Sequence, residues 1–394
     1  MRKILMRWQA SSFFGWGVAG LNLFERWTVG SDFQALMGVP ITARDLAGMD
    51  PLRYFVLQPA IAASNQFLEA FLAGKADCRE QQVVVIDGFG DTLTPIISLD
   101  RKGVGIHNIA RTIFENTLIH SMQPLESYDS LLCVSEWGAN LLRANTDKPV
   151  VMIHEGIDPS LFFPGPRSDV LDAECFYVFT GGKIEFRKGQ DLVMLAFREF
   201  AARHDDAVLV SSWNSPWPDY SVGFQVNLPA PLRKDSNGAL DLRRWATENG
   251  ISPHQFIALP AMPNFVMPMV LRQMDCAIQA SRCEAGTNLP AKEAMACGVP
   301  VILPNNTGMR DLIDTDNCVP LNSQDRVTSP EPGVGTDDWG ESRVDEIVAA
   351  LEQLYTDTQA RKRIGARGAE WILEKRRTWP DHARDLTAYL QSVL

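Results

Sequence analysis

Short apolar segments of strand length alternate with helix-like segments along the first half of this 394-residue chain. The candidate strands lie at 3–8, 33–36, 83–86, 104–106, 130–134 and 150–153. Between them lie helix-like segments such as 136–143. Strands that alternate with helices build a parallel sheet that is covered on both faces. The first half therefore predicts a doubly wound α/β domain.

The alternation stops at residues 154–169, HEGIDPSLFFPGPRSD, and then begins again. This segment is rich in Pro, Gly and Asp, which is typical of an interdomain linker. The second series of candidate strands lies at 175–182, 207–211, 256–259, 276–279 and 299–303. Two such domains in tandem place a cleft between them, and ligands bind at the carboxyl ends of parallel strands. Functional motifs are therefore expected directly after strands.

Net charge and cysteine usage narrow the class of protein. A formal charge of −11 argues against nucleic acid as a partner, because nucleic-acid-binding proteins need an excess of Lys and Arg. The seven cysteines form no C-x-x-C pair, which is typical of reduced, mostly buried thiols. The N-terminus shows no apolar secretion segment, and no run of about 18 apolar residues could span a bilayer. We expect a cytoplasmic protein.

The segment 276–302, CAIQASRCEAGTNLPAKEAMACGVPVI, carries the most informative motif. A buried strand is expected to end near Ala280, and a helix is expected to start near Leu289 or Pro290. The free N–H groups of that helix start, with Gly286 allowing close approach, favour an anionic group. Glu293 falls on the second turn of the helix, where a carboxylate can accept hydrogen bonds from the paired hydroxyls of a ribose. A capped helix with a surface glutamate is the alternative.

This segment resembles the signature of the family 4 retaining glycosyltransferases, with Ser-x-x-Glu, a turn containing glycine, Leu-Pro, and Glu-Ala-Met-Ala-x-Gly-x-Pro-Val. The resemblance implies that Glu284 faces the sugar of the donor and that Glu293 binds its ribose. It also implies that the backbone of the turn holds the diphosphate and the sugar hydroxyls. The residues of this turn are Gly286, Thr287, Asn288 and Leu289. Eight residues separate the two glutamates, one more than is usual in the family, which indicates one extra residue in the turn.

A second motif, GGKIEFRKGQDLVMLAF at 181–197, follows the first strand of the second half. Lys183, Arg187 and Lys188 precede its helix. A leaving nucleoside diphosphate develops negative charge, and fixed cations in a cleft with little water stabilise that charge and can replace a divalent metal. The motif resembles the family's phosphate-binding element, which implies that Gly182, Lys183 and Lys188 bind the sugar donor and that the lysines assist catalysis. A solvated basic turn is the alternative.

Residues 15–20, GWGVAG, match the pattern G-x-G-x-x-G. They lie too far from the preceding strand for a dinucleotide-binding turn, and the next strand ends without the required acid. An oxidoreductase that binds a dinucleotide through this segment is therefore the least favoured of three functional hypotheses. The segment resembles the glycine loop after the first strand of GT-B acceptor domains. That resemblance places Gly15 and Trp16 on the acceptor side and Gly17 near the phosphate of the sugar donor.

Two further residues of the first half follow candidate strands. His107 is expected at the end of the strand 104–106. In related enzymes a histidine in this place reaches the sugar of the donor; a hydrogen-bonded structural histidine is the alternative. Asp87 follows the strand 83–86 and is expected either to contact acceptor hydroxyls or to cap a turn.

The resemblances follow one another in matching order over most of residues 83–313. They imply the GT-B fold: two tandem Rossmann-like domains, with 1–165 on the acceptor side and 170–375 binding the nucleotide sugar, and a C-terminal helix at 376–394 that packs back on the first domain. The basic segment 361–377 is expected to face either solvent or anionic lipid at the inner membrane face.

The implied function is that of a retaining, metal-independent hexosyltransferase without a cofactor. Its donor would be a UDP or GDP sugar. Its acceptor would be a hydroxyl of a glycan, a lipid-linked sugar or a protein, in the synthesis of a glycan, polysaccharide or glycolipid. A degenerate GT-B protein that binds a sugar nucleotide or a partner without turnover is the alternative.

Overall fold

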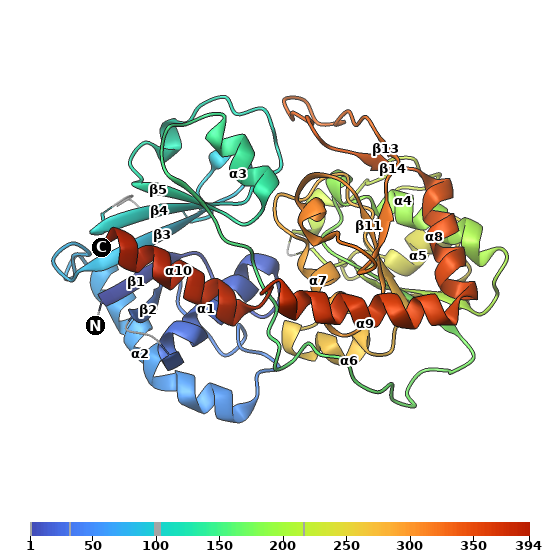
Figure 1. Ribbon diagram of the computed structural model, residues 1–394, viewed down its shortest axis with the longest axis horizontal. Coiled ribbons are helices and arrows are strands. Elements are labelled where there is room, and N and C mark those ends of the chain that lie inside the picture. Colours follow the sequence, from blue (N-terminus) through green and yellow to red (C-terminus); the bar gives the residue numbers. More distant parts are fainter. Residues whose placement is uncertain (1, 31–32, 98–103, 216) are drawn as a thin grey trace.

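The computed structural model describes residues 2–30, 33–97, 104–215 and 217–394, which form two lobes lying side by side (Figure 1). A parallel sheet forms the centre of the first lobe, in the order β2-β1-β3-β4-β5-β6. Its strands are β1 (Arg2–Arg7), β2 (Phe33–Met37), β3 (Val83–Phe89), β4 (His107–Thr112), β5 (Ser130–Cys133) and β6 (Val150–Met152).

The second lobe repeats this plan in the order β12-β11-β10-β7-β8-β9. Its strands are β7 (Phe176–Gly181), β8 (Ala207–Ser212), β9 (Phe256–Ala258), β10 (Cys276–Ile278), β11 (Val301–Pro304) and β12 (Val319–Leu321). A short antiparallel pair, β13 (Gln324–Asp325) with β14 (Glu341–Ser342), lies outside this sheet. The predicted α/β class with two doubly wound domains is confirmed.

Helices connect the strands and cover the sheets. The first lobe has α1 (Gly15–Gly30), α2 (Pro51–Leu72) and α3 (Glu136–Arg143). The second has α4 (Gln190–Ala201), α5 (Leu242–Glu248), α6 (Met267–Leu271), α7 (Leu289–Ala296), α8 (Val344–Thr356) and α9 (Thr358–Glu374). The last helix is α10 (Trp379–Val393). No described helix is both long and apolar enough to cross a membrane.

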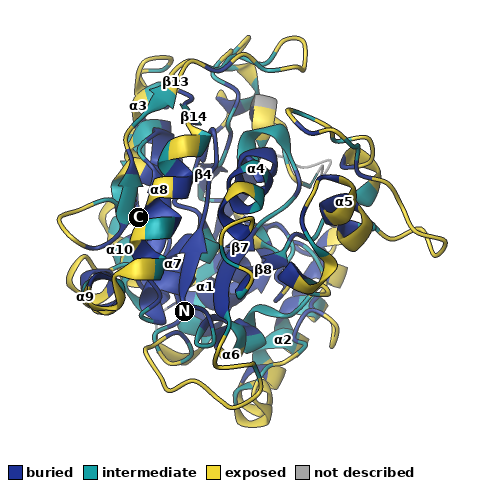
Figure 2. Ribbon diagram, turned by 90° about the vertical axis from the view of Figure 1, so that its right-hand side faces the viewer, coloured by how far each residue is buried: buried dark blue, intermediate teal, exposed yellow. Residues whose placement is uncertain are grey.

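The central strands read as continuous apolar runs because helices cover both faces of each sheet. Every residue of β3 is buried, and Figure 2 shows the same for the middle of β7 and β8. The apolar face of α9 also points inward, since Trp371 and Ile372 are buried in the core of the second lobe. The basic segment 361–377 therefore presents only one face of its helix to the surroundings.

The chain crosses between the lobes twice, and the two crossings lie against each other. Ile157 N–H donates to the carbonyl of Arg377 at 3.0 Å, and Trp379 N–H donates to the carbonyl of Ile157 at 2.9 Å. A Cβ on Gly156 would overlap the carbonyl carbon of Thr378, so only glycine fits there. The helix α10 then packs on α1, as the sequence predicted (Figure 1).

Two local predictions for the first lobe are wrong. Residues 15–20 are not a loop but the first turns of α1. Their glycines allow this helix to pack closely on the chain before it: a Cβ on Gly17 would lie 2.7 Å from Ser11, and one on Gly20 would lie 2.7 Å from Trp8 Nε1. The strand predicted at 104–106 instead begins at His107, because the side chain of Asn108 accepts the N–H of Gly105 at 2.8 Å and holds a turn before it.

Candidate functional site

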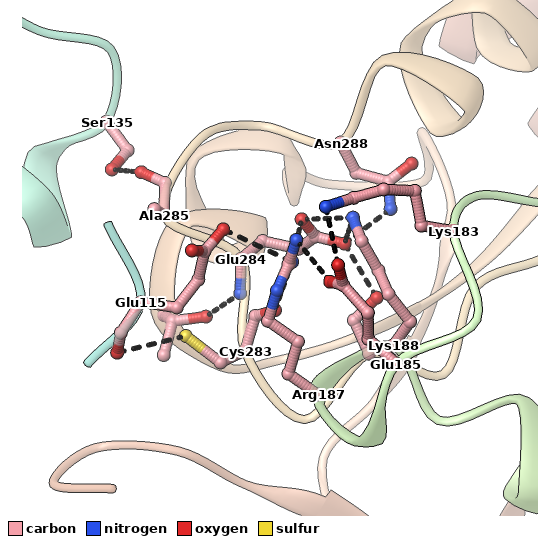
Figure 3. Close-up of polar contacts among 12 residues, drawn as sticks. Glu115, Ser135, Lys183, Glu185, Arg187, Lys188, Cys283, Glu284, Ala285 and Asn288 are labelled. Atoms are coloured by element: carbon pink, nitrogen blue, oxygen red, sulfur yellow. Dashed lines mark hydrogen bonds and ion pairs between the residues drawn. The ribbon is translucent and has the colours of Figure 1, made fainter. Parts of the chain in front are cut away.

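The carboxyl ends of β7 and β10 bring the two predicted motifs of the second lobe together. Glu284 lies in the loop after β10, and Lys188 lies in the short 3-10 helix η3 (Phe186–Lys188) after β7. Lys188 Nζ is 2.7 Å from each carboxylate oxygen of Glu284, and Arg187 Nη1 is 3.3 Å from one of them (Figure 3). Asn288 Nδ2 and Ser281 Oγ each donate to the same carboxylate at 2.7 Å.

These contacts fix the protonation state of the buried carboxylate. Burial alone would raise the pKa of Glu284, but the charges of Lys188 and Arg187 outweigh that effect and hold its pKa below the ordinary value. Burial lowers the pKa of Lys188, and the neighbouring carboxylate of Glu284 partly restores it. The site is therefore a charged pair with little access to water, where further electrostatic contacts are strong.

Lys183 joins the same network; with Lys188 it forms the predicted phosphate-binding pair, called the phosphate clamp below. Its Nζ is 2.5 Å from Glu185 and lies 5.6 Å from the ring centroid of Trp217. Glu185 also pairs with Arg187 at 2.8 Å. Burial alone would raise the pKa of Glu185, but the neighbouring cations lower it to about 2. Gly182 has φ +126°, a conformation that favours glycine, so no side chain covers the backbone between β7 and Lys183.

The turn between the two glutamates leads into α7 as predicted. Asn288 is the N-cap, since its side chain accepts the N–H of Ala291 at 3.0 Å. On its other side the turn meets the first lobe. Ser135 Oγ donates to the carbonyl of Ala285, and a Cβ on Gly286 would lie 3.7 Å from Glu155 Oε2. Thr287 is buried.

Glu293 lies inside α7 with an oxygen that accepts Asn264 Nδ2 at 2.6 Å. Burial raises the pKa of Glu293 to about 7. The backbone N–H of Asn264 donates to Ser12 of the first lobe at 2.6 Å. The predicted ribose-binding carboxyl therefore lies buried where a loop of each lobe meets α7.

The first lobe contributes the start of α1 to this meeting place. Gly15 is exposed, and a Cβ there would lie 3.5 Å from Leu289 Cδ1 at the start of α7. Trp16 is half-buried, and its ring packs under the guanidinium of Arg111 at 4.4 Å. The amino ends of α1 and α7 thus face each other across the junction of the two lobes.

The structure does not bring three other predicted residues to the site. Gly17 faces Ser11 inside the first lobe. His107 is the first residue of β4, so it lies at the amino end of the strand, opposite the carboxyl end that faces the site. Its Nε2 lies 3.3 Å from Ser130 Oγ. The prediction that His107 follows the end of a strand is wrong. The contact with Ser130 agrees with the alternative, a hydrogen-bonded structural histidine. Asp87 lies within β3, not after it.

The carboxylate of Asp87 is bound by other side chains of the first lobe. Both oxygens pair with Arg7, the last residue of β1, and the hydroxyl of Tyr128 donates to one of them. Burial and the carboxylate of Asp87 raise the pKa of Tyr128 far above its ordinary value. The placement of Asp87 on the acceptor side is therefore corrected to a structural ion pair that ties neighbouring strands together.

Sequence reasoning missed Glu115, which follows β4. Its carboxylate is 3.3 Å from Arg187 Nη1, so it faces the phosphate-clamp motif across the junction of the lobes (Figure 3). Burial raises the pKa of Glu115 to about 7, although the charge of Arg187 opposes the shift. Asp91 accepts the N–H of Glu115 at 2.5 Å and fixes this segment. The only sequence signal is a run of three polar residues, 115–117, shortly after a strand.

Residues 115–117 are hydrogen-bonded to a loop of the second lobe, residues 333–339, which lies between β13 and β14. Trp339 Nε1 donates to the carbonyl of Glu115 at 3.0 Å. Thr117 N–H donates to the carbonyl of Gly335 at 3.1 Å, and Gly335 N–H donates to Asn116 Oδ1 at 2.7 Å. Residues 333–339 therefore strap the two lobes together beside the clamp.

A cavity of about 470 Å³ lies next to this strap, between α3 and the 3-10 helix η7 (Thr307–Leu312). Its charged lining is mainly acidic, with Arg310 as its basic member; the acidic residues are Glu136, Asp311, Asp337 and Asp338. Such a lining disfavours a diphosphate, whereas uncharged hydroxyl groups could hydrogen-bond to it. An anionic ligand group is therefore expected on the Lys188 side. No group of three or more His, Cys, Asp or Glu side chains among the described residues could hold a metal ion.

Several solved structures share the two-lobed fold over nearly their whole length. Sucrose-phosphate synthase from Thermosynechococcus elongatus has a TM-score of 0.65 and 15% identity, and the match covers 100% of this chain and 99% of that one. HepE from Anabaena, in complex with UDP-glucose, has a TM-score of 0.63 and 14% identity, covering 100% of both chains. A glycosyltransferase from Rickettsia africae has a TM-score of 0.65 and 12% identity, covering 100% and 98%.

The fold is GT-B. Residues 167–328 match the family model of glycosyl transferases group 1. That range contains Lys183, Lys188, Glu284 and Glu293. No curated protein sequence matches the chain. The predicted resemblance to GT-B glycosyltransferases is confirmed, with the match concentrated in the lobe that carries both motifs.

Proposed function

We propose that this GT-B protein transfers a sugar from a nucleoside-diphosphate sugar to a hydroxyl group of an acceptor. The observation that carries the proposal is the convergence of Lys188, Lys183 and the Glu284 turn at the carboxyl ends of neighbouring parallel strands, within the segment that matches the group 1 model. This is where open α/β sheets bind their ligands. HepE, which shares the fold, was solved with UDP-glucose, and this supports a UDP sugar as the first donor to test.

The sugar donor would lie mainly on the second lobe. Its diphosphate would meet Lys188, Lys183 and the N–H groups at the start of α7. Its ribose hydroxyls would donate to Glu293, replacing the hydrogen bond from Asn264. Glu284 would hold Lys188 in place, because its carboxylate already accepts both contacts from that ammonium group.

The chemistry would be substitution at the anomeric carbon of the sugar with retention of configuration. The bond from this carbon to the leaving phosphate oxygen breaks, and the bond to the acceptor oxygen forms on the same face. The leaving phosphate takes the proton of the acceptor hydroxyl. Lys188 and Lys183 stabilise the charge that develops on the leaving group, and this stabilisation is worth more in a buried site than in water. We therefore propose that turnover needs no divalent metal.

The experiment is release of nucleoside diphosphate from a panel of UDP and GDP sugars, with and without EDTA, and mass analysis of any glycosylated product. Retention is tested by NMR of the product's anomeric centre. The proposal expects release from at least one donor, undiminished by EDTA. A chain that binds the nucleotide but releases none with any donor and acceptor would instead be a binding protein. The extra residue between Glu284 and Glu293 is the observation behind that alternative.

A further inference from the structure

A second group of buried charges lies on the other side of the glycine turn, where both lobes meet the linker. Arg111 from β4 and Lys292 from α7 are each 0% exposed. The guanidinium of Arg111 pairs with the carboxylate of Glu155, and Lys292 Nζ donates to the backbone carbonyl of the same residue at 3.0 Å. Among the described residues, Arg111 has one carboxylate partner, whereas Lys292 contacts a backbone carbonyl and forms no ion pair.

The neighbouring groups supply only part of the missing negative charge. Glu293 follows Lys292 in α7 and its charge favours the protonated lysine, but burial raises the pKa of Glu293 to about 7, so it offsets the charge of Lys292 only in part. His382 is buried beside the group, with Nδ1 held 2.8 Å from the carbonyl of His154. Burial lowers the pKa of His382 to about 3, so this imidazole is neutral. Burial also lowers the pKa of Lys292 to about 8. The group thus carries an excess of positive charge that burial makes costly.

Polar atoms of this group also lack partners. Arg111 Nε and Nη1, and the hydroxyl of the fully buried Thr287, have no hydrogen-bond partner among the described residues. Buried donors are nearly always satisfied in folded proteins, and each exception calls for an explanation. A guanidinium presents its N–H groups in a fork that matches the oxygens of phosphate or carboxylate.

The position of Arg111 indicates which ligand could accept hydrogen bonds from its free N–H groups. Its guanidinium lies 4.4 Å from the ring centroid of Trp16, in the first turn of α1, a turn that has no acidic residue. Its partner Glu155 lies against Gly286 of the turn. The cation therefore sits between the amino end of α1 and the glycine turn, whereas Lys183 and Lys188 surround Glu284.

We propose that Arg111 and Lys292 form a second oxyanion-binding site, which takes a phosphate-type group at the side of the cleft facing the first lobe. Each lobe supplies one cation, so a bound anion would neutralise the excess charge and hold the lobes together. The oxyanion belongs either to the diphosphate of the sugar donor or to an anionic group on the acceptor. The nature of the ligand rests on the proposed function; the binding of an oxyanion does not.

The test is calorimetric titration of inorganic phosphate and, separately, of UDP and GDP, into the wild type and the variants Arg111→Gln, Lys292→Met and Lys188→Ala. Since Arg111→Gln leaves Glu155 buried without its partner, the double variant Arg111→Gln/Glu155→Gln is measured as well. Arg143→Gln, on the exposed side of α3, is the matched control. Circular dichroism and the melting temperature report folding.

Phosphate affinity should fall at least about tenfold in Arg111→Gln, in Lys292→Met and in the double variant, the scale of one lost charge-assisted hydrogen bond. If phosphate still binds the UDP-saturated wild type and Arg111→Gln keeps its nucleotide affinity, the site takes an anionic group of the acceptor. If nucleotide displaces phosphate and Arg111→Gln loses nucleotide affinity, the site takes the diphosphate of the sugar donor.

The proposal is overturned if the wild type binds no phosphate, or if binding is lost in Lys188→Ala but unchanged in the folded double variant and in Lys292→Met. A protein that binds phosphate through Arg111 but transfers no sugar would leave this proposal standing and remove the proposed function. The two failures are therefore distinguishable.

Discussion

Lys188 Nζ lies 2.7 Å from both carboxylate oxygens of Glu284, so the predicted phosphate clamp and the predicted sugar-facing glutamate are each other's partners. The two residues come from loops after different strands, 96 positions apart in the chain. Removing either one leaves the other as a buried, uncompensated charge, which is more costly than losing the pair as a whole. Variants at this pair must therefore be checked for folding as well as for activity.

Lys188→Ala is expected to lower turnover by on the order of 10²-fold or more, because it removes a charge partner of the leaving group. Steady-state release of nucleoside diphosphate measures this. Lys362→Ala, at an exposed position in α9, is the matched control and should be unaffected. A folded Lys188→Ala variant with the turnover of the wild type would show that the clamp is assigned to the wrong residue.

Glu293→Ala is expected to weaken nucleotide binding about tenfold, the scale of a hydrogen bond to a charged group, and to change turnover less. Calorimetry with UDP and with its 2′-deoxy analogue measures the contribution of the ribose hydroxyl. The wild type should discriminate between the two nucleotides, and the variant should bind them about equally. Equal discrimination by both proteins would exclude a contact between Glu293 and the ribose.

The raised pKa of Glu115 predicts a pH-dependent stability. Its pKa is about 7 in the folded chain, against 4.5 for a free glutamate, so the folded state binds the extra proton between these values. Stability from this group is therefore lost as the pH rises from about 4.5 to 7. Glu115→Gln cannot ionise, so its stability relative to the wild type should grow over this range by roughly 3 kcal/mol.

Melting temperatures of the wild type and Glu115→Gln at pH 5 and pH 8 measure this difference. Glu69→Gln, on α2 and outside the site, is the control for the substitution itself. A difference for Glu115→Gln that is the same at both pH values would mean that Glu115 titrates normally.

Gly156→Ala is expected to destabilise the junction of the two crossings, since its Cβ would overlap the backbone of Thr378. Overpacking against a rigid backbone costs roughly 1–3 kcal/mol or more, which should lower the melting temperature by several degrees. Gly90→Ala is the control, because a Cβ there meets nothing within 4 Å. An unchanged melting temperature for Gly156→Ala would mean that the crossings separate easily.

Local signals account for the parts of the fold that the sequence predicted well. The bounds of α3 were predicted correctly, and its start at Glu136 is fixed by the N-cap Ser135, which accepts the N–H of Gly138. The start of α7 was likewise signalled by Asn288 before Leu289 and Pro290. Caps and strand alternation are properties of short segments, so they can be read without the rest of the chain.

The errors have a different origin. Residues 15–20 were misread because glycine favours both loops and close helix packing, and the positions of Ser11 and Trp8 in the folded chain decide between them. Asp87 was misread because its partners, Arg7 and Tyr128, come from other strands and loops. Arg111 and Glu115 carried no motif at all. Their roles depend on contacts between the two lobes, and such contacts have no local pattern.

The account is tested most directly by a crystal structure with UDP or GDP bound. It predicts the diphosphate within hydrogen-bonding distance of Lys188 and the backbone N–H groups of residues 287–289, with the ribose on Glu293. A nucleotide that binds instead in the acidic cavity between α3 and η7, or on the surface of either lobe, would contradict the assignment of the site.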